Sequence, residues 1–142
     1  MVGEPDTPKV LWETFIPVKP VRWSVKARNA GKIAMMYSPS NLKTYQDQVV
    51  RFLKGAYHKD PIDEPIAIRM MFFLPKPKTV TRDYPTVMPD LSNLLKATED
   101  CLTKAGVLRD DSIVINHECW KFYAENEKVG TEITIVGLSG SD

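Results

Sequence analysis

Apolar residues recur along this chain with two periods, and each period predicts one kind of element. Strands are expected over residues 10–18 and 131–136, where turn-forming residues bound short β-prone runs. The run at residues 66–74 is apolar on both faces, a pattern typical of a central strand. Residues 112–116 and 118–123 predict two further strands or one bent strand.

Residues 21–37 predict a hairpin with one basic face. Apolar and polar side chains alternate strictly from residue 21 to residue 28, and a turn at residues 29–31 returns the chain into residues 32–37. An ordinary solvated face has the same pattern, but no acid stands between Glu13 and Asp47. The basic residues of the first strand are Arg22, Lys26 and Arg28.

Two segments have apolar residues at helical spacing. The first begins at Ser38-Pro39 or at Ser40, since serine caps a helix N-terminus well and proline suits the first turn. The second covers residues 91–105 and is followed by Gly106, the residue type preferred just after a helix end. Its apolar and polar faces do not overlap, so one side is expected to pack on the core.

A proline-rich segment at residues 75–89 precedes the second helix. A loop of this length in a compact domain is usually functional or disordered. Tyr84 and Met88 within it could stack or wedge against a ligand, and a packing role for either is equally compatible with the sequence. The basic residues of the loop are Lys76, Lys78 and Arg82.

The composition is that of an ordinary globular protein, with 43% hydrophobic and 26% charged residues. Together with the element order it predicts a single α/β (α+β) domain over residues 1–142, a small mixed β-sheet with two main helices. Flexible tails are expected at about residues 1–9 and 138–142.

The net charge of +1 conceals a segregation of charge along the chain. Residues 15–59 carry nine basic residues and one acid, Asp47, which is a local net charge of +8. Residues 83–142 carry five basic and eleven acidic residues, a local net charge of −6. This asymmetry favours a polyanionic partner for the basic part and either cation binding or plain self-neutralisation for the acidic part.

The cysteines and the N-terminal residues indicate an intracellular protein. Cys101 and Cys119, with His117 nearby, do not form a four-ligand zinc pattern, and both are expected to be reduced, small apolar residues. The first nine residues are not a signal-peptide pattern, and no apolar run approaches the length of about 20 residues that crosses a bilayer. A cytosolic location is expected.

Three aspartates occupy the junctions around the second helix. Asp90 precedes it, while Asp110 and Asp111 follow it and lead into a strand. Mg²⁺ prefers oxygen ligands and bridges to substrate phosphate, so such acids suit metal-dependent phosphodiester hydrolysis. Because a fifteen-residue helix is about 20 Å long, the chain after Gly106 would have to run back along it before the acids could meet.

Lys96 lies on the polar face of the second helix, near the same end as Asp90. A lysine ammonium can hold a scissile phosphate or stabilise the charge that develops on it. The alternative is an i,i+4 ion pair with Asp100, which is worth a few tenths of a kcal/mol.

The stretches 89–97, 99–102, 106–107 and 110–112 resemble the RusA family of Holliday-junction resolvases, the crossover junction endodeoxyribonucleases. That family carries an Asp-x-Asp-Asn-x-x-Lys motif that opens a helix and an Asp-Asp pair after the helix. The spacing from the first acid to the last matches without a gap, and the resemblance spans about residues 15–136.

The resemblance implies a RusA-like fold, a homodimer, and Mg²⁺-dependent symmetric nicking of four-way DNA junctions in recombination and repair, with Mn²⁺ as a substitute ion. It also implies the cytoplasm of a bacterial or phage-infected cell. By position, Asp90 and Asp111 are metal-binding acids and Lys96 is the catalytic lysine, with Asp110 adjacent and Asp100 a recurrent helix acid. The implied phosphate-binding residues are Arg22, Lys26, Arg28, Lys76, Lys78 and Arg82.

Ser92 departs from the family motif, which has a second aspartate at this position. Both residue types cap a helix well, and a serine hydroxyl can still ligate Mg²⁺ directly or through water. The site loses one formal negative charge, so a non-catalytic protein that binds branched DNA stays open as an alternative. A separate alternative is an endonuclease that acts mainly on other branched or single-stranded DNA.

Overall fold

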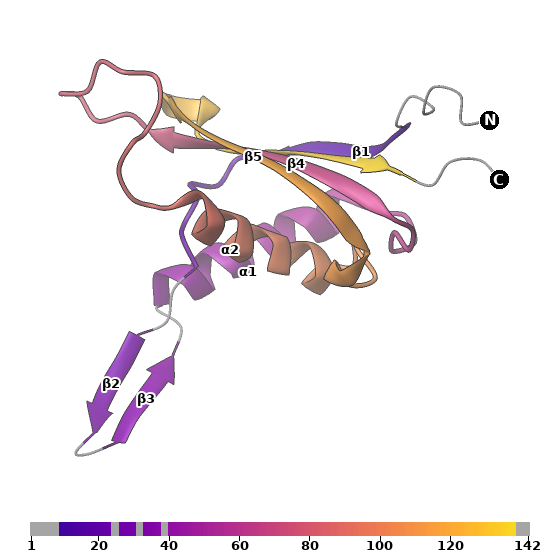
Figure 1. The fold of residues 1–142 in the computed structure, drawn as a ribbon, viewed down its shortest axis with the longest axis horizontal. Coiled ribbons are helices and arrows are strands. Elements are labelled where there is room, and N and C mark those ends of the chain that lie inside the picture. The colour runs from indigo at the N-terminus through magenta and orange to yellow at the C-terminus, as the bar shows by residue number, and fades with distance from the viewer. Residues whose placement is uncertain (1–8, 24–25, 31–32, 38–39, 139–142) are drawn as a thin grey trace.

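The computed structural model describes residues 9–23, 26–30, 33–37 and 40–138. Its centre is a four-stranded mixed sheet, and both helices cover the same face of that sheet (Figure 1). A separate two-stranded hairpin projects away from the helical layer (Figure 1). The expectation of a small α+β fold with a mixed sheet and two main helices is confirmed.

The sheet has the strand order β1-β6-β4-β5, which makes β1 and β5 its edges. Only the pairing of β4 with β5 is parallel; β1 with β6 and β4 with β6 are antiparallel. Helix α2 connects the two parallel strands, so it must cross one face of the sheet. The strands are β1 (Lys9–Ile16), β4 (Ile66–Pro75), β5 (Val114–Ala124) and β6 (Gly130–Gly137), and the helices are α1 (Ser40–Ala56) and α2 (Leu91–Lys104).

The core lies between the helices and one face of β4. Alternate residues of this strand are buried, and the hydrophobic stripes of α1 and α2 pack over them. One buried polar contact joins the helices, since the Tyr45 hydroxyl and the Thr98 hydroxyl lie 2.7 Å apart. The buried residues of β4 are Ile66, Ile68, Met70, Phe72 and Leu74.

Two expected segments are refined by the structure. At residues 112–123 the single-strand alternative is the one observed, since β5 is continuous, and its first expected residues instead form a short 3₁₀ turn, Asp111–Ile113. The hairpin consists of β2 (Lys26–Ala30) and β3 (Ile33–Tyr37), and residues 21–23 are not part of it. The backbone N–H of Trp23 instead donates to the Asn93 carbonyl of α2 at 2.8 Å, which takes this segment out of strand pairing.

Both cysteines are free, as expected, and Cys101 is fully buried. Burial raises the pKa of the Cys101 thiol to about 12 and that of the Cys119 thiol to about 11. Each therefore stays protonated near neutral pH and behaves as an apolar side chain. None of the helices in the described ranges has the length and apolar character to cross a bilayer.

Two glycines form a matched test of this packing. A Cβ added at Gly130 would lie 2.3 Å from the Ile16 carbonyl oxygen and 2.6 Å from Phe15 Cζ, whereas a Cβ at Gly55 meets no atom within 4 Å. We expect Gly130→Ala to lower the free energy of unfolding by about 1–3 kcal/mol, because the β1–β6 pairing must open to admit the methyl group. Gly55→Ala in α1 is expected to raise it by up to about 1 kcal/mol.

Urea denaturation of the two variants beside the unchanged protein measures both effects. Equal free energies of unfolding for Gly130→Ala and the unchanged protein would contradict the close approach of β1 and β6 at this position.

Candidate active site

Asp90 is the N-cap residue of α2, and its carboxylate makes no hydrogen bond with the backbone of that helix. Its backbone is extended and its carbonyl accepts hydrogen bonds from the amides of Asn93 and Leu94, at 3.2 and 3.1 Å. The side chain makes no capping hydrogen bond, although aspartate usually makes one at this position. The carboxylate is thus exposed and available for a ligand at the positive end of the helix dipole.

Lys96 points its ammonium at an aromatic ring instead of an acid. The Nζ atom lies 4.2 Å from the centre of the Trp23 ring, within the range of a cation–π contact. Trp23 is itself held against the first turn of α2 by its backbone hydrogen bond to Asn93. Among the described residues, no ion pair joins Lys96 to Asp100. The alternative that an i,i+4 ion pair holds the Lys96 side chain is therefore not observed.

Asp110 and Asp111 lie at the other end of α2. The amides of Val107 and Leu108 both donate to the carbonyl of Leu102, at 2.9 and 3.3 Å, which keeps the chain beside the last turn of the helix. Helix α2 has 14 residues and is therefore about 21 Å long. The chain runs back along the helix only after these acids, as β5, so the structure does not bring Asp110 or Asp111 to Asp90 within one chain.

The hydrogen bonds donated by Ser112 hold the pKa of Asp110 below its usual range, and they fix this carboxylate as the cap of the 3₁₀ turn. Asp111 follows in the first turn and is exposed. Because the pKa of Asp110 is lowered by folding, its capping contribution is present above the ordinary aspartate pKa and is lost as the pH falls through the lowered value. The carboxylate is charged at neutral pH.

Within one chain, the predicted Mg²⁺ ligands lie at opposite ends of α2. In the part of the chain that the structure describes, no three His, Cys, Asp or Glu side chains lie close enough together to hold a metal ion. The donor types suit Mg²⁺, since Asp90 and the exposed Ser92 offer oxygens at one end of α2 while Asp110 and Asp111 offer them at the other. Glu99 does not complete either set, because its carboxylate pairs with His117 Nε2 at 2.9 Å.

Sequence reasoning missed Lys121. This residue lies near the end of β5, and its ammonium donates to the carbonyls of Val87 and Pro89, each at 3.0 Å. The contact brings a second lysine to the residues that immediately precede Asp90. The available signal was a lysine within an otherwise apolar and aromatic strand segment, and the pattern alone does not say what it contacts.

The basic residues predicted to bind phosphate are only partly described. Lys26 and Arg28 belong to β2, but their side chains lie outside the described part of the structure. The guanidinium of Arg82 lies 5.8 Å from the Tyr123 ring centre. The exposed basic residues of the described segments at residues 17–23 and 76–89 are Lys19, Arg22, Lys78 and Arg82, and Lys76 is half-buried.

Tyr84 and Met88 keep much of their surface in water. Tyr84 is 55% exposed, although its ring centre lies 5.6 Å from that of Phe122, and Met88 is 60% exposed. Tyr84 therefore packs on the sheet through one part of its ring and presents the rest to solvent.

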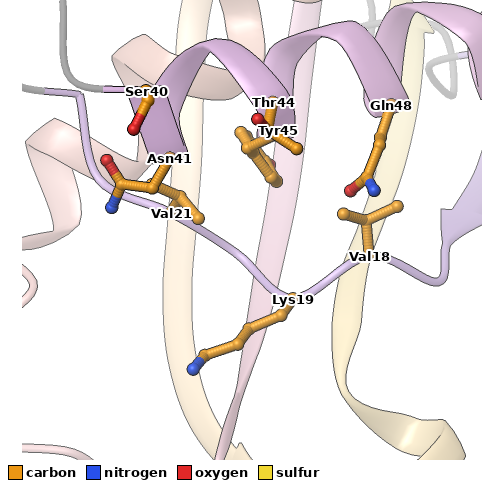
Figure 2. A pocket seen from close by; sticks show the side chains of 8 residues that line it. All are labelled: Val18, Lys19, Val21, Ser40, Asn41, Thr44, Tyr45 and Gln48. Carbon is orange, nitrogen blue, oxygen red and sulfur yellow. The ribbon is translucent and has the colours of Figure 1, made fainter.

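A pocket of about 340 Å³ lies between residues 18–21 and the start of α1 (Figure 2). Among the described residues that line it, Lys19 is the one with a charge and none is an acid. In Figure 2 its other labelled side chains come from the first turns of α1 and from Val18 and Val21. The pocket does not include any of the predicted acids, so it is not a candidate metal site.

The fold is that of a small α+β protein, and comparison with known proteins identifies its class as an endodeoxyribonuclease. The model of the family "Endodeoxyribonuclease RusA" matches residues 17–136, so the chain belongs to this family.

Two curated relatives carry the family name. The crossover junction endodeoxyribonuclease RusA of Escherichia coli O139:H28 is 31% identical over 96 residues, which cover 67% of this chain and 72% of that protein. The protein of the same name from Enterobacteria phage 82 is 33% identical over 79 residues, 56% of this chain and 58% of that protein. The uncharacterized protein YqaN of Bacillus subtilis is 27% identical over 111 residues, 70% of this chain and 77% of that protein.

The contact between Lys96 and Trp23 is testable without any activity. A double-mutant cycle with Lys96→Met and Trp23→Leu is expected to give a coupling free energy of about 0.5–1 kcal/mol in urea denaturation, because the ring and the ammonium attract each other directly. The matched cycle combines Lys96→Met with Trp12→Phe. Trp12 packs on Tyr57, and no coupling is expected there. Zero coupling in the first cycle would show that the ammonium is not held by Trp23.

Proposed function

We propose that this protein is a Mg²⁺-dependent endonuclease that resolves Holliday junctions by paired symmetric nicks. The observation that carries the proposal is the family match over residues 17–136, together with the exposed Asp90 and Asp111 at the two ends of α2. The two relatives named crossover junction endodeoxyribonuclease RusA support the choice of substrate. Four-way DNA is two-fold symmetric, and a two-fold homodimer would present one catalytic site to each of two opposed strands.

The proposed roles follow the positions around α2. Asp90 and Asp111 are the proposed metal-binding acids, with Asp110 and Ser92 as further oxygen donors. Lys96, held over Trp23, is the proposed cation that offsets negative charge developing on the scissile phosphate. Basic side chains of residues 22–28 and of the loop at residues 76–82 are proposed to bind phosphates without reading sequence.

The separation of the carboxylates makes the homodimer a requirement of this proposal. Strand β5 is an edge strand with two large exposed apolar residues, Ile115 at 65% and Trp120 at 47%. If two copies pair antiparallel along this edge, both α2 helices lie on the same face of a continuous sheet and run in opposite directions. The N-terminus of α2 from one protomer then lies near the C-terminus of α2 from the other protomer, at the same end of the joint sheet.

In that arrangement Asp90 of one protomer approaches Asp110 and Asp111 of the other, and two equivalent carboxylate sets form. Among the described residues, the backbone hydrogen bonds between the loop at residues 76–89 and β5 involve only the last residues of that strand. The Tyr123 amide donates to the Asp83 carbonyl, and the Lys76 amide donates to the Ala124 carbonyl. Most of the length of this edge is therefore available for a second copy. An edge strand without a partner exposes backbone hydrogen-bonding groups that can pair with other chains and cause aggregation. Pairing two copies along β5 would cover these groups.

A synthetic four-way junction tests the proposal. With Mg²⁺ or Mn²⁺ present, we expect two symmetric nicks, none in EDTA, and a loss of about 100-fold or more in the cleavage rate for Asp111→Asn, since a bound metal ion supplies several kcal/mol of charge stabilisation. The matched control is Asp60→Asn, an exposed aspartate outside the site. Junction binding without metal-dependent nicking would favour the non-catalytic branched-DNA binder, and faster nicking of forks or flaps would favour the broader endonuclease.

A further inference from the structure

The last part of β5 holds the proline-rich loop against the sheet at several points. The Tyr123 amide donates to the Asp83 carbonyl at 3.0 Å, and the Lys76 amide donates to the Ala124 carbonyl at 3.1 Å. The ring of Phe122 lies 5.6 Å from that of Tyr84. The loop therefore leaves β4, follows the end of β5 and reaches α2 along a fixed route.

Lys121 makes the last of these contacts before the helix. Its ammonium donates to the carbonyls of Val87 and Pro89, the second of which belongs to the residue directly before Asp90. The two accepting carbonyls lie on either side of Met88, so one side chain fixes the orientation of both peptide groups. The ammonium has three donors, and these carbonyls take two of them.

Helix stability does not explain a lysine here. A cation close to the N-terminus of a helix opposes the helix dipole and lowers the stability of that end. In the described part of the chain, Lys121 makes no ion pair with an acid, so a salt bridge does not explain its position either. What its two hydrogen bonds do fix is the backbone from which Asp90 projects.

We propose that Lys121 is a positioning residue that sets the place and direction of the Asp90 carboxylate through the carbonyls of Val87 and Pro89. The proposal rests on the proposed function for its effect on cleavage and on the hydrogen bonds alone for its effect on the loop. A catalytic group displaced by about 1 Å can cost about 100-fold in rate. In this role Lys121 contacts the Val87 and Pro89 carbonyls, and neither the reacting phosphate nor the Asp90 side chain.

Three variants separate the possible roles of Lys121. Lys121→Met keeps the aliphatic stem but removes the donors, whereas Lys121→Arg keeps a charged group able to donate to both carbonyls. The matched control is Lys128→Met, which removes an exposed lysine from the turn between β5 and β6.

The first measurement is amide hydrogen exchange of residues 84–94, read by mass spectrometry on the full chain. We expect exchange about tenfold faster in Lys121→Met, because two hydrogen bonds that hold this segment are lost. Lys121→Arg and Lys128→Met are expected to exchange like the unchanged protein. This readout requires no DNA and no metal ion, so it holds even if the proposed function fails.

The second measurement is single-turnover cleavage and binding of a four-way junction. We expect Lys121→Met to cleave about 100-fold more slowly with an unchanged Kd and an unchanged salt dependence of binding, and Lys121→Arg to restore most of the rate. Unchanged exchange in Lys121→Met would overturn the proposal. So would a weaker Kd with a shallower salt dependence, because that result identifies Lys121 as a phosphate contact. If the unchanged protein cuts no junction, the proposed function fails while the exchange result still decides the role of Lys121.

Discussion

The length of helix α2 determines how far apart the aspartates at its two ends lie. Helix α2 connects the parallel strands β4 and β5 and therefore must cross the face of the sheet, with its ends about 21 Å apart. Asp90 precedes the helix, and Asp110 and Asp111 follow it. Because the hydrogen bonds of Val107 and Leu108 keep the following chain beside the last helical turn, one chain holds the carboxylates as two separated sets.

Strand β5 organises both ends of that helix. At its start it follows the turn capped by Asp110, at its middle His117 pairs with Glu99 of α2, and at its end Lys121 holds the residues before Asp90. It has no neighbouring strand on its outer side among the described residues, and its apolar residues Ile115 and Trp120 are exposed. The same strand that separates the two sets of acids in one chain could thus bring them together between two chains.

The local distribution of charge is more informative than the total. A net charge of +1 argues against a simple polycation, yet the chain divides into a basic and an acidic half. The structure refines this division around the N-terminus of α2. Asp90 is the N-cap, Lys121 donates to the Pro89 carbonyl just before it, and Lys96 of α2 lies over the Trp23 ring. Such a mixed set suits a phosphodiester, which needs cations for its charge and an acid for a metal ion.

Sequence patterns predicted the elements whose burial is periodic. The stripes of α1 and α2 and the apolar β4 were correct because hydrophobic burial repeats with the period of the element. The strand expected at residues 21–23 was wrong. The alternation of apolar and polar residues is a local pattern, and it carries no information about the hydrogen bond from the Trp23 amide to Asn93, far along the chain. The support of Lys96 by Trp23 and of the loop by Lys121 could not be predicted for the same reason.

A working site in the proposed dimer needs carboxylates from two chains, and mixing two inactive variants shows whether it does. Chains carrying Asp90→Asn and chains carrying Asp111→Asn are unfolded together, refolded as mixed dimers and assayed for nicking of a four-way junction with Mg²⁺. A site shared between protomers predicts that each mixed dimer contains one intact set, Asp90 from one chain and Asp111 from the other, and nicks one strand. Complete inactivity of mixed dimers that form and bind the junction would rule out a shared site, because it would mean that each site draws both acids from a single chain.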